Sequence, residues 1–262
     1  MEFEVYNKLV FAATGGRAFD AKKKTLIFVH GAGMDHTVWS LQTRWFAWNG
    51  WSVLALDLPG HGKSEGPPIN SIYEMGKWLG KLIDVLGTKH VSLVGHSMGA
   101  FVALESGALL PDKISSIAML GVATRMRVHP DLLRAACEND PIAWELIVSW
   151  GFGQPSHFGA NRLPGLWMQG GGRALLSKAP KNTLGIDLAA CDRHEGALSA
   201  SQKLSCPTLI LCGDCDQMTT PKAAHSLGQT VKDVNIVTLR NCGHMMTVEK
   251  PDETLTALIN FL

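Results

Sequence analysis

The stretch VGHSMGA, Val94 to Ala100, decides how the rest of this 262-residue chain is interpreted. It places Ser97 between Gly95 and Gly99, directly after an apolar run and before a helical pattern. A sharp turn from strand to helix strains the backbone of its central residue, and small neighbours make that geometry possible. Such a turn would expose the serine hydroxyl as a nucleophile. The same letters also occur in ordinary small-residue turns, so the flanking sequence must decide.

The flanking sequence alternates between short apolar runs and helical patterns. Runs bounded by Gly, Pro or Asp are typical of strands that are covered on both faces. Apolar residues fall on one helical face in 71–86 and again in 252–262. This alternation predicts an α/β fold with a mostly parallel sheet flanked by helices, and FEVY and LVFAAT are expected to add an antiparallel edge. The predicted buried strands are 25–30, 53–58, 91–95, 114–120, 207–212 and 234–239.

Residues 124–198 break this rhythm, because no strand is predicted there. The segment holds Trp144, Trp150, Trp167 and a glycine run at 170–172. About 75 residues are far more than a connection between strands requires. We therefore expect a helical cap, or lid, inserted into a core of residues 1–123 and 199–262. The alternative is a bundle of covering helices with no role in binding.

Composition bounds the class of protein. Apolar residues make up 46% and charged residues 18%, as in a globular domain. The formal net charge of +1 gives no indication of nucleic acid or an acidic membrane as partner. No apolar run approaches the ~20 residues of a membrane span, and no secretory signal is evident. Six scattered cysteines then predict reduced thiols in a cytoplasmic protein, while the isolated Cys-Gly-Asp-Cys stretch at 212–215 lacks a second ligand pair for zinc. The sequence leaves the oligomeric state open.

A serine nucleophile needs a base, and the base needs an acid that orients it. In this topology both belong on loops after later strands. His244 follows the run 234–239 and precedes the last helix, which makes it the candidate base. The loop CGDCDQMTTP supplies Asp214 and Asp216 after the run 207–212; Asp216 lies deeper in the loop and is preferred, with Asp214 as the alternative.

An acyl-transfer site also needs two backbone donors for a developing oxyanion. The N–H of Met98, next to Ser97, is one candidate, and the N–H of Ala32 in the loop HGAGMDH is the other. His30, Asp35 and His36 of the same loop could be mistaken for metal ligands. The turn glycines account for that segment, so no metal and no organic cofactor is predicted.

Five motifs in order give the sequence a clear resemblance to the α/β-hydrolase superfamily, of the small esterase and lipase type. They are FVHGAG, LDLPGHGKSEG, VGHSMGA, CGDCDQMTTP and CGHMMTVEKPDE. The resemblance implies an eight-stranded sheet, a Ser97–His244–Asp216 triad, oxyanion donors at Ala32 and Met98, and a cap over the site. In similar proteins the fourth residue of the GxxD loop is the acid, which again selects Asp216. His61, in the GHG turn, is interpreted as structural.

These features predict a carboxylesterase-like serine hydrolase (EC 3.1.1) that acts on a small-molecule ester with a small to medium, mainly apolar acyl group. A lactonase, a thioesterase and a carbon–carbon bond hydrolase could use the same triad, although Met245 after the histidine counts against the last. A non-catalytic ligand receptor would need a broken triad, and none is visible. The candidate pocket residues are Met34, Trp144, Trp150, Trp167 and Met245.

Overall fold

The computed structural model describes residues 1–157 and 165–262. In this part of the chain eight strands form one sheet in the order β1-β2-β4-β3-β5-β6-β7-β8. Strands β1 and β2 pair antiparallel with each other, β2 pairs antiparallel with β4, and all other neighbours are parallel. The predicted eight-stranded, mostly parallel α/β sheet is confirmed. The strands are β1 (Glu2–Val5), β2 (Lys8–Ala13), β3 (Thr25–Val29), β4 (Ser52–Leu56), β5 (Val91–His96), β6 (Ile114–Leu120), β7 (Thr208–Gly213) and β8 (Val234–Leu239).

Helices connect and cover the strands. Among the described residues, none has the length and hydrophobicity needed to cross a lipid bilayer. The helices are η1 (His36–Trp39), α1 (Ser40–Trp48), α2 (Ile72–Leu86), α3 (Met98–Leu109), α4 (Pro130–Cys137), α5 (Ile142–Gly151), η2 (Gln154–Ser156), α6 (Met168–Leu176), α7 (Thr183–Arg193), α8 (Ala197–Lys203), α9 (Pro221–Gly228), α10 (Met246–Glu249) and α11 (Pro251–Phe261).

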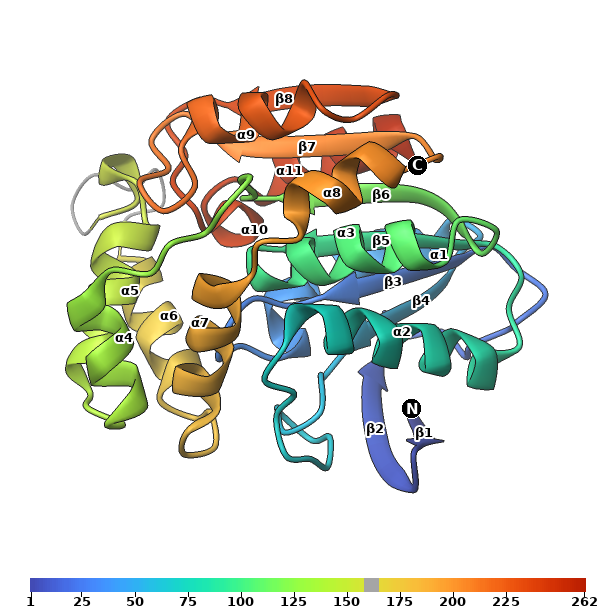
Figure 1. Ribbon diagram of the computed structural model, residues 1–262, viewed down its shortest axis with the longest axis horizontal. Helices are drawn as coiled ribbons and strands as arrows, with labels where there is room; N and C mark the ends of the chain where they lie inside the picture. The colour runs from blue at the N-terminus through green and yellow to red at the C-terminus, as the bar shows by residue number, and fades with distance from the viewer. Residues whose placement is uncertain (158–164) are drawn as a thin grey trace.

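The interior of the sheet is covered on both faces, which explains its nearly continuous apolar strands. The prediction of a buried strand at 234–239 was wrong, because β8 is an edge strand in which Asn235 and Thr238 are exposed. Side chains of successive residues point to opposite faces of a strand. Ile27 and Val29 of β3 accordingly pack into a core with α2, α3, α8 and α9, whereas Leu26 and Phe28 pack into a second core with α1, α10 and α11. Figure 1 shows the two helical layers in front of and behind the sheet. Every residue of β3 is buried; four of the five are apolar, and the exception, Thr25, pairs its hydroxyl with that of Thr88 at 2.8 Å.

Helices α4 to α7 gather beyond one end of the sheet, at the left of Figure 1. They lie in the chain between β6 and β7 and share an apolar cluster of their own, which includes Ile147, Leu184 and Leu188. Two core residues, Met34 and Met245, join this cluster from loops at the strand ends. The helix α8 that follows them packs instead on α3 of the core.

Candidate active site

Ser97 occupies the turn between β5 and α3 with φ 54 and ψ −117. Positive φ is strained for any residue with a Cβ. The turn is tight, because a Cβ on Gly95 would overlap the carbonyl oxygen of Gly99, and a Cβ on Gly99 would overlap that of Val29. The Ser97 N–H donates to the carbonyl oxygen of Leu120 in β6 at 2.9 Å. The two glycines therefore let the backbone place the Ser97 side chain at the carboxyl end of the sheet.

His244 and Asp216 form a buried pair on loops after β8 and β7. The two atoms that face each other, His244 Nδ1 and Asp216 Oδ2, lie 2.8 Å apart. The side chains are 2% and 0% exposed. With Nδ1–H donating to the carboxylate, the Nε2 atom of a neutral His244 keeps its lone pair, which is the form that a general base requires.

Asp216 is held by its own loop. Its Oδ1 atom accepts hydrogen bonds from the N–H groups of Met218 and Thr219, both at 2.8 Å, and its Oδ2 atom accepts one from the Thr219 hydroxyl at 2.7 Å. Burial alone would raise the pKa of Asp216, but the charge and hydrogen bond of His244, together with Thr219, outweigh it and lower the pKa. Asp214, the alternative acid, is exposed and accepts from the Cys242 N–H at 3.2 Å.

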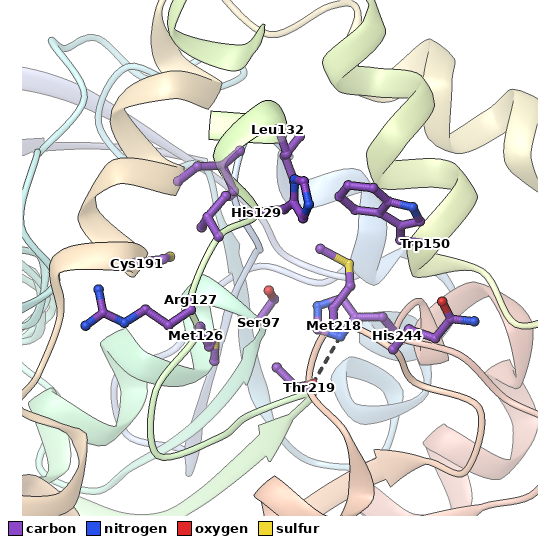
Figure 2. A pocket seen from close by; sticks show the side chains of 14 residues that line it. Ser97, Met126, Arg127, His129, Leu132, Trp150, Cys191, Met218, Thr219 and His244 are labelled. Carbon is purple, nitrogen blue, oxygen red and sulfur yellow. Dashed lines mark hydrogen bonds between the residues drawn. The ribbon is translucent and has the colours of Figure 1, made fainter. Parts of the chain in front are cut away.

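Ser97, His244 and Ala32 line one cavity of about 290 Å³. Figure 2 shows the Ser97 and His244 side chains directed into it, with Leu132, His129 and Trp150 from the segment between β6 and β7 facing them. Most of the lining is apolar, and the polar exceptions away from the triad, Arg127, His129 and Gln217, are exposed. The remaining lining residues are Met126, Val128, Leu188, Cys191, Met218 and Thr219.

The two candidate oxyanion donors both lie near Ser97: Met98 follows it in the chain, and Ala32 lines the same cavity. Met98 begins α3, so its N–H is one of the groups that a helix leaves without an internal partner. Ala32 lies in the loop after β3, and a Cβ on the preceding residue, Gly31, would lie 3.4 Å from the Ser97 Cβ. Neither N–H donates a hydrogen bond within residues 1–157 and 165–262. Among the described residues, both N–H groups are therefore left without an internal acceptor.

The predicted pocket residues separate in the structure. Trp150 lines the cavity that contains Ser97. Met34, Trp167 and Met245 line a second cavity, also of about 290 Å³, with His96 in its wall. Trp144 packs against the apolar cluster of α4 to α7 and lines neither cavity. Spacing on a helix could not predict this division, because it depends on how the helices dock on the core.

His96, which precedes the serine, was not predicted to contribute to the site. Its Nε2–H donates to the carbonyl oxygen of His244 at 2.8 Å, which joins the turn that carries Ser97 to the loop that carries His244. Burial, followed by the neighbouring His244, lowers the pKa of His96 to about 3, so the ring stays neutral. Its place between Gly95 and Ser97 was visible in the sequence, but its partner lies 148 residues away.

Glu249 was also missed, although it organises the loop around His244. Its buried carboxylate accepts from the N–H groups of Gly243 at 3.1 Å and Met245 at 3.0 Å, one on each side of the histidine. The same carboxylate accepts from the Gly153 N–H at 2.9 Å and the Ser156 hydroxyl at 2.7 Å. An acid in the last turn of α10 carries no sequence signal that distinguishes it from a surface glutamate.

Asp35, His36 and Asp57 offer ligand atoms within 4.8 Å of one another. The Asp57 carboxylate is already engaged, because Oδ1 accepts from the His36 N–H and lies 2.8 Å from His36 Nδ1, while Oδ2 accepts from the Lys63 N–H. Asp35 accepts from the Thr37 N–H and caps η1. These contacts connect the loops after β3 and β4, and the carboxylates already accept hydrogen bonds from backbone N–H groups, as in a turn.

The fold and the site geometry define an α/β hydrolase, and the comparison with known families agrees. A model described as "Alpha/beta hydrolase family" matches residues 26–257, so the chain belongs to that family. The family resemblance predicted from the five motifs is thereby confirmed.

Individual relatives are hydrolases of several kinds. A (E)-2-((N-methylformamido)methylene)succinate hydrolase from Acinetobacter baylyi is 25% identical over 240 residues, covering 89% of this chain and 88% of the relative. The enol-lactonase from Burkholderia xenovorans LB400 superposes with a TM-score of 0.87 at 19% identity, covering 100% of this chain and 99% of its own. A thermophilic esterase gives a TM-score of 0.81 at 25% identity, covering 100% and 96%.

Proposed function

We propose that the protein is a serine hydrolase that cleaves carboxylic esters of small to medium, mainly apolar acyl groups through an acyl-enzyme intermediate. The observation that carries this proposal is the 2.8 Å contact between His244 and Asp216 beside the cavity that Ser97 lines. A serine, a histidine with a free Nε2 atom and a buried carboxylate supply the nucleophile, the base and the group that orients the base.

In the proposed reaction Ser97 Oγ attacks the ester carbonyl carbon while His244 Nε2 takes the hydroxyl proton. The carbonyl oxygen becomes an oxyanion, which accepts hydrogen bonds from the N–H groups of Ala32 and Met98. Collapse of the intermediate breaks the bond to the alcohol, which leaves with the proton from His244. Water then attacks the acyl-serine by the same route, releases the acid and restores Ser97. Asp216 stabilises the imidazolium form of His244 in both halves.

The cavity supports the size and polarity of the proposed acyl group. Its volume of about 290 Å³ lies at the small end of ligand pockets. Leu132, Trp150, Leu188 and Met218 supply apolar walls, which favour an alkyl chain over a charged group because burial of a charge without a partner is costly. We propose that the segment 124–198 acts as the cap that closes this cavity over a core of residues 1–123 and 199–262.

The substrate class is tested by a panel of p-nitrophenyl esters from acetyl to octanoyl, with matched lactones, thioesters and succinyl esters. We expect kcat/KM to be highest for an uncharged acyl chain of short or medium length. A higher value for the succinyl ester would contradict the apolar pocket, and a higher value for a lactone or thioester would replace the ester as preferred substrate. A carbon–carbon bond substrate completes the panel.

We also propose a cytoplasmic location. All six cysteines are free thiols, and four of them are buried: Cys191, Cys206, Cys212 and Cys242. Free thiols in this number are typical of a reducing compartment. Fractionation of cells with the untagged protein tests this proposal.

A further inference from the structure

Asp187 is a fully buried carboxylate in α7, in the segment between β6 and β7. Its Oδ2 atom lies 2.8 Å from the backbone nitrogen of Gly33 and 2.8 Å from Nε2 of His61, and it accepts a hydrogen bond from each. Within the described residues, its Oδ1 atom has no hydrogen-bond partner. A carboxylate buried with one oxygen unpaired is costly. A residue that served only to fasten α7 to the core would gain more from an apolar side chain.

The partner of Asp187 is the loop that carries Ala32. Gly33 adopts φ +65, and a Cβ there would lie 2.8 Å from Cδ1 of Leu184, one turn before Asp187 in α7. Helix α7 therefore packs tightly against Gly33, and its Asp187 accepts the hydrogen bond from the Gly33 N–H. Because that N–H is engaged, it cannot serve a substrate oxygen, whereas the neighbouring N–H of Ala32 stays free.

Both peptide groups that flank Ala32 are held in place. The Gly31 carbonyl oxygen accepts from Nδ1–H of His30 at 2.8 Å, and in a planar trans peptide the Ala32 N–H must then point the opposite way. The next peptide group carries the Gly33 N–H, which Asp187 holds. The core thus orients one side of Ala32 through His30, and α7 orients the other through Asp187.

His61 is protonated, and its positive charge stabilises the buried Asp187 carboxylate. Its Nδ1 atom lies 3.0 Å from the carbonyl oxygen of Pro59 and its Nε2 atom 2.8 Å from Asp187, so both ring nitrogens face acceptors and both donate. Burial opposes protonation, but the charge and hydrogen bond of Asp187 outweigh it and raise the pKa of His61. The ring also packs against His30 at a tilt of 52°, with the centroids 4.7 Å apart.

We propose that Asp187 is a positioning residue for acyl transfer: by holding the Gly33 N–H it fixes the second of the two peptide groups around Ala32 and so keeps the loop in the conformation that directs the Ala32 N–H toward the oxyanion. This inference rests on the proposed function, in which Ala32 stabilises the tetrahedral intermediate. It assigns the segment between β6 and β7 a part in catalysis in addition to covering the cavity.

The test compares four variants on a p-nitrophenyl ester. Asp187→Ala and Asp187→Leu remove the acceptor, and Leu fills the space that Ala would leave empty. Asp187→Asn keeps one oxygen acceptor without the charge. Thr183→Ala is the matched control, because Thr183 is buried in the same helix and its hydroxyl donates at 3.4 Å to the Gly60 carbonyl oxygen of a neighbouring core turn.

We expect the Ala and Leu variants to lose about 10- to 100-fold in kcat, with KM changed by less than about threefold, because a misdirected oxyanion donor costs less than a deleted one. The Ki of hexylboronic acid, whose tetrahedral serine adduct places an oxygen where the oxyanion forms, should rise by the same factor. The Ki of hexanamide, a planar analogue, should not change. The kcat of Asp187→Asn should stay within about fivefold of the wild-type value, and the kcat of Thr183→Ala should equal the wild-type value.

Wild-type kcat and boronate Ki in Asp187→Leu would overturn the inference, as would an equal loss in Thr183→Ala. Thermal unfolding of each variant separates a loss of fold from a loss of positioning. Ser97→Ala distinguishes a failure of the proposed function from a failure of the role proposed for Asp187. If it keeps turnover, the proposed function fails and this inference with it; if it is inactive while Asp187→Leu is not, only this inference fails.

Discussion

The strain at Ser97 shows how single residues make the site. A residue with a Cβ at φ 54 stores about 1–3 kcal/mol of backbone strain. The hydrogen bond from its N–H to Leu120 and the close packing of Gly95 and Gly99 hold that conformation. The hydroxyl is thereby presented at the start of α3, where the helix dipole and the free N–H of Met98 favour negative charge.

The choice of acid is testable by one exchange at each aspartate. Asp216→Asn keeps the shape but takes away the charge that holds His244 in the tautomer a base needs, so we expect kcat to fall by about 10⁴. Asp214→Asn is the matched control in the same loop, and its kcat should stay within about threefold of the wild type. Steady-state kinetics on one ester measure both. Equal losses, or a larger loss in Asp214→Asn, would contradict the assignment of the acid.

Residues whose position follows from the chain path could be predicted, and residues that act through distant contacts could not. Ser97 and Asp216 each follow a buried strand, His244 follows the edge strand β8, and parallel strands bring their carboxyl ends to one edge of the sheet. Asp187 meets Gly33 across 154 residues, and Glu249 meets Gly153 across 96. Those contacts depend on how helices dock, which neither periodicity nor motif spacing encodes.

Among the elements, the loop between β8 and α10 depends most on one side chain. Glu249 connects the N–H groups on both sides of His244 to the segment after α5. The His244 N–H in turn donates to the Gly151 carbonyl oxygen at 2.7 Å. His244, the proposed base, is therefore positioned jointly by the core and by the segment between β6 and β7.

Glu249→Ala should leave several buried N–H groups without an acceptor. We expect it to destabilise the fold by about 3 kcal/mol and to lower kcat, measured by urea unfolding and steady-state kinetics. Glu253→Ala, at an exposed position of α11, should change neither quantity by much. Unchanged stability and kcat in Glu249→Ala would show that the His244 loop holds its shape without this carboxylate.

Strands and helices could be predicted where burial gives the sequence a regular apolar pattern, and they could not be predicted where it does not. The interior strands are apolar because both faces are covered, and α2 has one apolar face, so both were predicted. Helix α1 was not, because it is apolar on both sides: Phe46 and Ala47 are buried while Leu41, Trp45 and Trp48 are exposed. Without a polar face, no helical period stands out.

For the whole molecule, buried neutral histidines link stability to pH. Burial is the largest cause that lowers the pKa of both His30 and His96 to about 3. A group whose folded pKa is depressed contributes stability that is present above its unfolded pKa, near 6.5, and is lost as pH falls toward 3. His61 has the opposite sign, because its pKa is raised; its contribution is present below about pH 6.5 and is lost as pH rises through the folded pKa.

We therefore expect the free energy of unfolding to fall as pH is lowered from about 6.5, by up to ~1.4 kcal/mol per pH unit for each buried neutral histidine. His96→Gln, whose amide can still donate to the His244 carbonyl oxygen, should show a shallower fall. His129→Gln replaces an exposed histidine, so its free energy of unfolding should change with pH as in the wild type. Urea unfolding at several pH values between 7 and 5 measures this. An unchanged slope in His96→Gln would contradict the buried, neutral state of that ring.

The proposed covalent intermediate on Ser97 can be trapped with an alkyl fluorophosphonate and located by mass spectrometry of the intact chain and its peptides. We expect a single phosphonate on Ser97, loss of esterase activity in step with labelling, and a Ser97→Ala variant that folds but neither labels nor turns over ester. Undiminished turnover in Ser97→Ala, or a label on another residue that accounts for the lost activity, would contradict the proposed intermediate.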